Sequence, residues 1–320
     1  MKTVLIAGAT GYLGRYLVEA FRAKGYRVRV LVRSTSKIQE TGPALAPNIS
    51  DLIDEVRTGD ITKSETLKDV CEGVHTVVST VSLMAQTSQL TWHDVDFLGN
   101  KNLLMEAERS KCESFLYFSV FQAHLLEHVP MVKAHEDFVG VLKSSSLQST
   151  IIRPTGYFSD LKAFFDMAKA GRCYLVGKGE NSVNPIHGRD LAEASIEALT
   201  GFEREVDIGG PEVLTWNQIS RLAFQAIGEK PRLSHIPLRL ARAFLEIIRP
   251  FWRSKAELWD FFVSSGALNF EAPRRGERVL ADFFRDLQAN EVHDNLGHGQ
   301  SMAKQRHLIC DNPYYRPNEN

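Results

Sequence analysis

Three glycines stand at even spacing in the segment LIAGATGYLGRYL (residues 5–17), between an apolar run and a helix-like stretch: Gly8, Gly11 and Gly14. Glycine adopts backbone angles that other residues avoid, and it lets the main chain approach a ligand closely. A helix that begins there offers unpaired N–H groups and the positive end of its dipole to phosphate oxygens. The spacing therefore predicts a dinucleotide-binding loop, although tight turns without a ligand also collect glycine.

The residues after the second predicted strand bear on the choice of cofactor. NAD-selective loops place an acidic residue about 20 positions beyond the glycines, where it binds ribose hydroxyls. Here the segment VLVRSTSK (residues 30–37) has Arg33 in that place, and Lys37 follows four residues later. Arginine cannot accept a hydrogen bond from a hydroxyl, but it can pair with a 2′-phosphate. We therefore predict NADP(H) as the cofactor, with a solvated basic turn as the alternative.

These residues must be positioned by the surrounding elements, and the first half of the chain alternates β-branched runs with amphipathic stretches. That alternation is typical of a parallel sheet covered by helices. Strands are predicted at 3–8, 27–33, 55–60, 76–81, 114–120 and 150–156. Helices are predicted near 12–24, 64–71, 98–110, 132–143 and 159–170. The fold class expected is α/β, with a Rossmann-type doubly wound parallel sheet.

After about residue 172 the pattern loosens, and we expect a small, mainly helical C-terminal lobe. The predicted organisation is a nucleotide-binding core at 1–172, remaining sheet strands and a substrate lobe at 173–288, and a flexible tail at 289–320. Within the lobe, residues 237–253 form a basic amphipathic segment with arginines on one face. Such a segment is a surface helix, a lid over an apolar acidic substrate, or a patch that contacts a membrane surface.

Composition excludes several classes of protein. The 320 residues carry a formal net charge of -1, which argues against nucleic acid as a partner. The four cysteines form no CxxC pair, so neither a zinc site nor a disulfide framework is predicted and no metal is expected. No apolar run is long enough to span a bilayer, and no leader precedes the first strand pattern. We expect a soluble cytoplasmic protein.

The sequence resembles the extended and atypical short-chain dehydrogenases/reductases. GATGYLG (8–14) is similar to their phosphate-binding loop, and further similarity covers Gly59-Asp60, IIRPTGYFSD (151–160) and NPIHGRDLA (184–192). The resemblance implies that the pyrophosphate is lined by Gly8, Thr10, Gly11, Tyr12, Leu13 and Gly14. It also implies that Asp60 and Ile61 lie at the adenine, and that Pro154 flanks the nicotinamide.

The catalytic signature of that superfamily is incomplete here. Its Y-x-x-x-K tyrosine usually protonates the substrate, yet the region that should carry the motif reads EHVPMVKAHEDFV (127–139). Alignment on Lys133 places Val129 at the tyrosine position, whereas alignment on Glu136 places His128 there and Val132 at the lysine. The one literal match, Tyr174–Lys178, comes too late in the chain.

Three explanations of the missing tyrosine remain open. Lys133 or His128 could donate the proton, because a pocket can shift either group toward neutral pH, and Lys133 would also contact the cofactor. Ser119, at the end of the fifth strand, matches a serine common at this site. Alternatively, the substrate needs little acid catalysis, or the protein binds its cofactor without catalysing a reaction.

A closer resemblance links the chain to one branch of the atypical members. TWHDVDFLGNKNLL (91–104), MVKAHEDF (131–138) and APRRGERVLADFF (272–284) are similar to the divinyl chlorophyllide 8-vinyl reductase branch, and NmrA-like proteins share the first half. We therefore predict an NADPH-dependent reductase of an apolar, conjugated small molecule. The alternative is a non-catalytic NADP(H)-binding regulator or accessory subunit; a sugar-nucleotide epimerase fits less well.

Overall fold

The computed structural model describes residues 1–83 and 90–292. Its centre is a seven-stranded sheet with the order β3-β2-β1-β4-β5-β6-β9, in which every neighbouring pair is parallel. The strands are β1 (Thr3–Ala7), β2 (Arg27–Val32), β3 (Glu55–Thr58), β4 (Thr76–Ser79), β5 (Ser114–Phe118), β6 (Gln148–Pro154) and β9 (Glu205–Ile208). The predicted α/β class and Rossmann-type sheet are confirmed.

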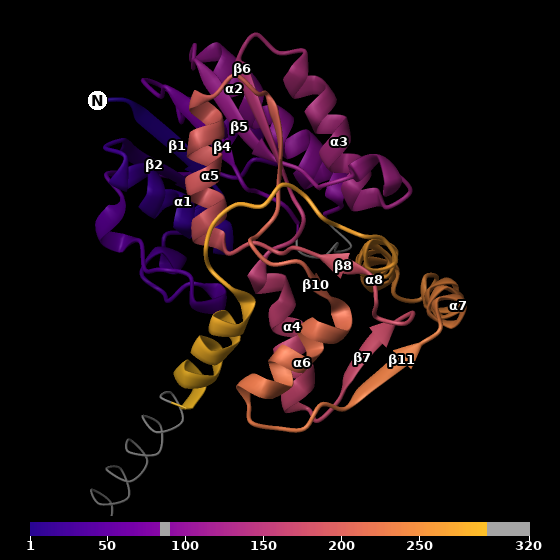
Figure 1. Cartoon of the computed structure of the whole chain (residues 1–320). Helices are drawn as coiled ribbons and strands as arrows, with labels where there is room; N and C mark the ends of the chain where they lie inside the picture. Colours follow the sequence, from indigo (N-terminus) through magenta and orange to yellow (C-terminus); the bar gives the residue numbers. More distant parts are fainter. Residues whose placement is uncertain (84–89, 293–320) are drawn as a thin grey trace, which may run out of the picture.

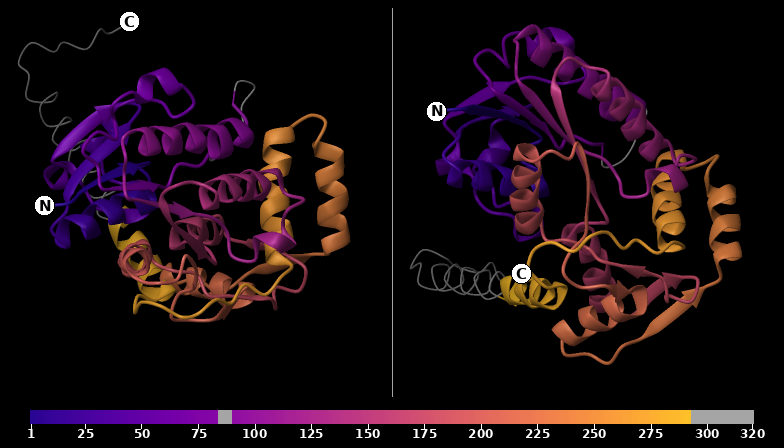
Figure 2. Two further views of the ribbon diagram at one scale, coloured as in Figure 1. Left: turned by 90° about the horizontal axis from the view of Figure 1, so that it is seen from above. Right: turned by 45° about the horizontal axis from the view of Figure 1, so that its top comes forward.

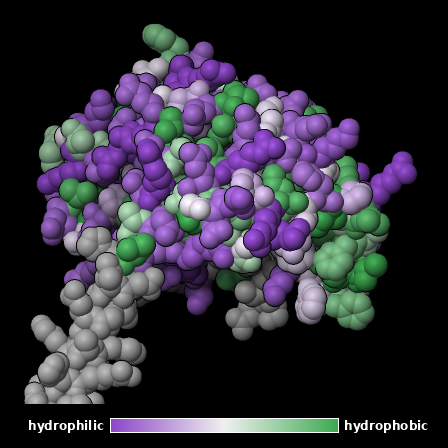
Figure 3. Space-filling view, turned by 60° about the horizontal axis from the view of Figure 1, so that its bottom comes forward, coloured by the Kyte–Doolittle hydropathy of each residue, from purple (hydrophilic) through white to green (hydrophobic). Residues whose placement is uncertain are grey.

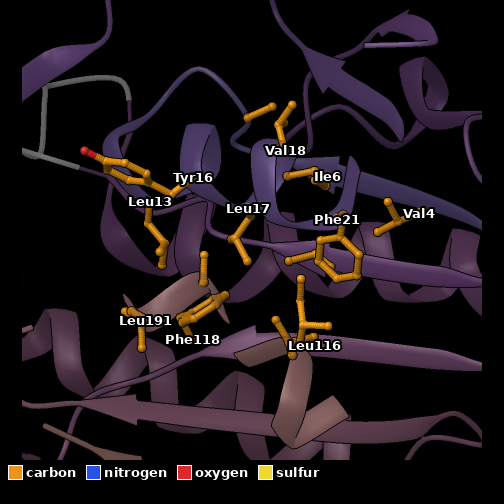
Figure 4. Packing of buried hydrophobic residues seen from close by; sticks show 14 of the residues in the cluster. Val4, Ile6, Leu13, Tyr16, Leu17, Val18, Phe21, Leu116, Phe118 and Leu191 are labelled. Atoms are coloured by element: carbon orange, nitrogen blue, oxygen red, sulfur yellow. The ribbon is translucent and has the colours of Figure 1, made fainter. Parts of the chain in front are cut away.

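Helices cover both faces of this sheet, which is why its central strands are apolar along their whole length. Helices α1 (Tyr12–Ala23) and α5 (Gly188–Thr200) pack together on one face, and α2 (Asn100–Arg109) and α3 (Pro130–Lys143) lie on the other (Figure 1). Leu13, Leu17 and Phe21 of α1 point into the core between α1 and the sheet, where Leu116 and Phe118 of β5 also lie (Figure 4). The apolar residues of the helix predicted near 12–24 therefore form the face that packs on the sheet.

The order of the strands reverses between β1 and β4, since the chain runs from β1 outward to β3 and then returns to β4. In an open parallel sheet, ligands bind at the carboxyl ends of the strands beside such a reversal. The glycine-rich loop follows β1 directly, so the fold brings the predicted phosphate site to this point.

The second lobe lies beyond the carboxyl edge of the sheet (Figure 1). It contains α4 (Phe158–Lys169), α6 (Trp216–Ala226), α7 (Leu238–Ile248) and α8 (Arg253–Gly266). Beside these helices it has two small sheets, β7 (Cys173–Val176) with β11 (Leu233–Ile236), and β8 (Ser182–Val183) with β10 (Leu214–Thr215). No helix in residues 1–83 or 90–292 is long and apolar enough to cross a membrane.

Three local predictions differ from the structure. The helix expected at 64–71 is a single 3-10 turn, Ser64–Leu67, because the backbone at Asp69 enters the left-handed region with a φ of 62°. The helix expected near 98–110 is preceded by a π-helical segment, His93–Gly99. The predicted tail begins inside a helix that spans 280–292, while the rest of the tail, 293–320, lies outside the described residues.

Candidate cofactor and active site

The glycine-rich loop joins β1 to α1 at the carboxyl edge of the sheet. Gly8 has a φ of 84°, and a Cβ atom there would lie 2.5 Å from Oγ1 of Thr80. A Cβ atom on Gly14 would lie 2.1 Å from the carbonyl oxygen of Gly8. Neither position has room for a side chain, so the close packing of strand, loop and helix requires both glycines.

Among the described residues, no side chain binds the main-chain N–H groups in the first turn of α1. Its N-cap residue is Gly11, no side chain caps the helix, and the first turn holds no acidic residue. N–H groups at an uncapped helix start are donors for an anion, and the helix dipole favours negative charge there. The loop and the helix start therefore fit the pyrophosphate of a dinucleotide.

The side chains of Tyr12 and Leu13 serve packing. The hydroxyl of Tyr12 accepts a hydrogen bond from the main-chain N–H of Gly188 at 3.1 Å, and burial raises the pKa of this tyrosine. Leu13 is buried in the core next to α1. Either residue can reach a cofactor only through its main chain, and Tyr12 ties the start of α1 to the start of α5.

Arg15 is a residue of the site that the sequence analysis missed. Its buried guanidinium donates to three main-chain carbonyls: those of Thr10 at 3.2 Å, Pro47 at 3.0 Å and Lys37 at 2.6 Å. Burial lowers the pKa of this group. Arg15 therefore fixes the glycine-rich loop against the segment that follows β2, and its place directly after the third glycine is the one signal the sequence offers.

Arg33 and Lys37 lie just beyond β2, on the segment that Arg15 holds. Both side chains are exposed, and the ion pairs formed within residues 1–83 and 90–292 use neither of them. Between them Ser34 and Ser36 share a hydrogen bond of 3.1 Å. Two exposed cations and two hydroxyls beside an anion-binding loop suit a further phosphate group.

Asp60 and Ile61 follow β3 at the same edge of the sheet. One carboxylate oxygen of Asp60 accepts from the N–H and the hydroxyl of Thr62, at 3.0 and 2.8 Å, so this side chain stabilises its own turn. Ile61 is buried against Gly99, where a Cβ atom would lie 2.8 Å from the isoleucine side chain. These contacts position the turn next to the expected adenine site.

Ser119 is buried at the end of β5, in a charged cluster. Its hydroxyl donates to the carboxylate of Glu136, which pairs with both terminal nitrogens of Arg153 at 2.7 and 2.9 Å. Burial alone would lower the pKa of Arg153, but its bonds to Glu136 and Glu205 outweigh that effect and raise the pKa. The proton of the serine hydroxyl is thus committed to Glu136 and does not point to a substrate.

The two other candidate acids lie elsewhere. Lys133 has a side chain that is 63% exposed, and its ammonium pairs with Asp137 at 2.8 Å. His128 is exposed, with Nε2 at 3.2 Å from Oγ of Ser264 in α8. No hydrogen bond or ion pair in the described parts of the chain joins Ser119, Lys133 and His128 to one another.

A second polar group that the sequence analysis missed lies on the same face of β5 as Ser119. The hydroxyl of Tyr117 is 2.6 Å from Nδ1 of His135, and Nε2 of that histidine is 3.2 Å from Oδ1 of Asp96. All three side chains are buried, and burial raises the pKa of Asp96 and of Tyr117. The second oxygen of Asp96 accepts from the N–H of Leu83, which links the group to the segment after β4.

Pro154 ends β6 and is buried, and the residues after it enter α4. Four aromatic side chains follow Pro154 in the chain, Tyr157, Phe158, Phe164 and Phe165, and of these Phe158 and Phe165 are buried in the core of the lobe. Phe164 stacks on Trp216 with ring centroids 5.7 Å apart. Tyr157 is half-buried and remains the best placed of the four for contact with a ligand.

A parallel sheet with a phosphate-binding turn after its first strand defines a dinucleotide-binding protein of the Rossmann type. The family described as NAD(P)H-binding matches residues 8–201, and the chain belongs to this family. The fold is shared with the NADPH-dependent quinone oxidoreductase QOR2 of Escherichia coli, whose structure was solved in complex with NADPH. The TM-score is 0.67, with 18% sequence identity over 89% of this chain and 99% of that one.

Two groups of relatives support the resemblance drawn from the motifs. The photosystem II assembly factor Ycf39 of Synechocystis sp. is 25% identical over 286 residues, which cover 87% of this chain and 82% of the relative. The chloroplastic divinyl chlorophyllide a 8-vinyl-reductase of Arabidopsis thaliana is 25% identical over 336 residues, which cover 94% of this chain and 79% of the relative. The predicted similarity to reductases of this superfamily, and to the vinyl-reductase branch, is confirmed.

Proposed function

We propose that the protein is an NADPH-dependent reductase of an apolar, conjugated small molecule. Membership of the NAD(P)H-binding family and similarity to vinyl reductases support the reaction class. The main support is the glycine-rich loop, in which Gly8 and Gly14 have no room for a side chain and lead to a helix start that no side chain caps. The exposed cations Arg33 and Lys37 follow the next strand.

The residues divide between binding and orientation. Main-chain N–H groups of the glycine-rich loop would hold the pyrophosphate, and Arg33 and Lys37 would bind the 2′-phosphate. Asp60 and Ile61 would border the adenine, and Pro154 the nicotinamide. The bound dinucleotide supplies a hydride, while the protein orients the substrate and excludes water from it.

A conjugated substrate accounts for the missing tyrosine. Ser119 donates a hydrogen bond to Glu136, and Lys133 pairs with Asp137, so neither group is arranged as a strong acid. Addition of a hydride to a conjugated double bond spreads the negative charge over the conjugated system, and therefore depends less on a positioned acid than reduction of an isolated carbonyl.

The same residues favour a second candidate, an accessory protein that binds NADP(H) without turning it over. No bond within residues 1–83 and 90–292 unites Ser119, Lys133 and His128 into a proton-donating group. Similarity to Ycf39, which is described as an assembly factor, fits this candidate.

A single assay separates the two candidates. The purified chain is loaded with NADPH, and absorbance at 340 nm is followed after addition of divinyl chlorophyllide or of a panel of enones and vinyl compounds. Oxidation that requires an acceptor, and that is lost in Gly14→Ala, supports the reductase. NADPH that stays bound and reduced with every acceptor supports the accessory protein. Absence of NADPH binding by the wild type would refute both.

A further inference from the structure

Helices α7 and α8 form an antiparallel hairpin at the edge of the lobe, in which α8 lies beside α3 and α7 lies on the outside (Figures 1 and 2). The two helices pack through small and branched apolar residues. Ala241, Leu245 and Ile248 of α7 bury one face against Ala256 and Val263 of α8. These buried contacts hold the two helices together, and they involve only some of the apolar residues of the hairpin.

A second apolar face of the hairpin points to solvent. Leu240, Phe244, Ile247 and Phe251 recur at helical spacing along α7 and the turn after it, and each is at least 49% exposed. Trp252, Trp259 and Phe262 extend this face onto α8, and the rings of Phe244 and Trp259 stack with centroids 6.1 Å apart. We name these seven residues the outer face.

Figure 3 shows hydrophobic side chains gathered at the side of the molecule where α7 and α8 lie. Single exposed apolar residues are ordinary on a protein surface, but a contiguous aromatic patch marks a site of interaction. The outer face therefore marks a site of interaction, and the charges of the hairpin indicate the kind of partner.

The hairpin also carries an excess of positive charge. Residues 237–266 hold five basic and three acidic side chains, whereas the whole chain has a net charge of -1. The acidic side chains are paired, Glu246 and Asp260 with Arg249, and Glu257 with Arg253. The ion pairs of the described residues use none of the other three cations, Arg239, Arg242 and Lys255.

We propose that the hairpin docks the protein on the surface of an anionic lipid bilayer. Tryptophan and phenylalanine side chains on one side of a helix, with arginines and lysines on the other, suit the boundary between headgroups and acyl chains. Lys255, whose ammonium lies 5.9 Å from the centre of the Trp252 ring, would face the headgroups beside that ring. The helices lie on the bilayer and do not cross it, in keeping with their length. This inference is independent of the proposed function.

The test is flotation of the full chain with vesicles of phosphatidylcholine alone or with about one third phosphatidylglycerol. We expect flotation with the anionic vesicles only, decreasing with salt. Phe251→Ser combined with Trp252→Ser should weaken partitioning by roughly tenfold or more, since it removes two aromatic anchors. Arg239→Gln combined with Arg242→Gln should weaken it by about 25-fold, at about fivefold for each cation.

Matched controls come from other surfaces of the molecule. Phe202→Ser removes a fully exposed phenylalanine, and Lys24→Gln with Lys68→Gln removes two exposed cations. Both controls should float like the wild type, and thermal melting should confirm that every variant folds. The proposal is wrong if the protein does not float, if neutral vesicles bind it equally, or if the controls lose as much binding. It is also wrong if the outer-face variants change only self-association in sedimentation, because a second copy of the chain would then be the occupant.

Discussion

Replacement of Arg33 by alanine tests whether the segment after β2 selects NADP(H). Arg33 is exposed and belongs to none of the ion pairs within residues 1–83 and 90–292, so its loss removes no contact that stabilises the fold. Surface substitutions of this kind usually change the free energy of unfolding by less than about 0.5 kcal/mol. Any change in cofactor affinity can therefore be assigned to a lost contact with the ligand.

The size of the effect follows from one charge-assisted hydrogen bond. Such a bond contributes about 1.5–3 kcal/mol, which corresponds to a loss of about 10- to 150-fold in NADPH affinity. Because the guanidinium is exposed to solvent, salt screens it, and we expect the lower part of this range at about 0.15 M salt and a larger loss at lower ionic strength. The affinity for NADH should not change, since NADH has no 2′-phosphate.

Isothermal titration with NADPH and with NADH, at two salt concentrations, gives four affinities for the wild type and four for each variant. Lys24→Ala is the matched control, because it removes an exposed cation at the far end of α1. The assignment fails if Arg33→Ala binds NADPH as tightly as the wild type. It also fails if NADH affinity falls by the same factor, because the residue would then affect the conformation of the loop and not contact the 2′-phosphate.

Three further predictions concern contacts at the start of α5, where His187 is the N-cap residue and Asp190 lies in the first turn. Tyr12→Phe removes the bond to Gly188 and should cost about 0.5–1.5 kcal/mol in urea unfolding with no change in NADPH affinity, whereas weaker binding would assign the hydroxyl to the cofactor. Asp190→Asn leaves the guanidinium of Arg278 without its buried carboxylate and should cost about 2–3 kcal/mol, below the value for a fully buried pair because Arg278 is 43% exposed; a change under about 0.5 kcal/mol would contradict the role. Burial lowers the pKa of His187 to about 4, so the folded protein binds fewer protons than the unfolded chain, and stability should fall by about 3 kcal/mol as the pH drops from about 6.5 to 4. His187→Asn should lose less stability over that window in urea titrations, and an identical pH profile would refute the assignment.

The sheet was predictable because its signals are local. Each of the six strands predicted in the first half corresponds to a strand of the main sheet. Thr215 caps the start of α6 through a reciprocal pair of hydrogen bonds with Gln218, a pattern that is also local in sequence. The predicted helix at 64–71 failed because apolar spacing does not reveal that Asp69 enters the left-handed region. Apolar periodicity predicted strands and helices correctly where it extended over several helical turns or several alternating residues.

The catalytic region was less predictable, because residue type does not determine the partner of a side chain. Lys133 and His128 were candidates by alignment, and the fold engages them with Asp137 and Ser264. His135 lies two residues after Lys133 and was not a candidate, yet it is the residue that joins two other buried polar groups. Such partners come from elements that the chain brings together only on folding.

The sequence by itself determined that a dinucleotide-binding turn follows the first strand, because the spacing of Gly8, Gly11 and Gly14 acts through local backbone geometry. Tertiary structure alone decided that Tyr12 pairs with Gly188 and that Arg15 gathers three carbonyls. It also decided that α7 keeps one of its two apolar faces in solvent. Backbone angles depend on neighbours in the chain, whereas burial and pairing of a side chain depend on segments that are distant in sequence.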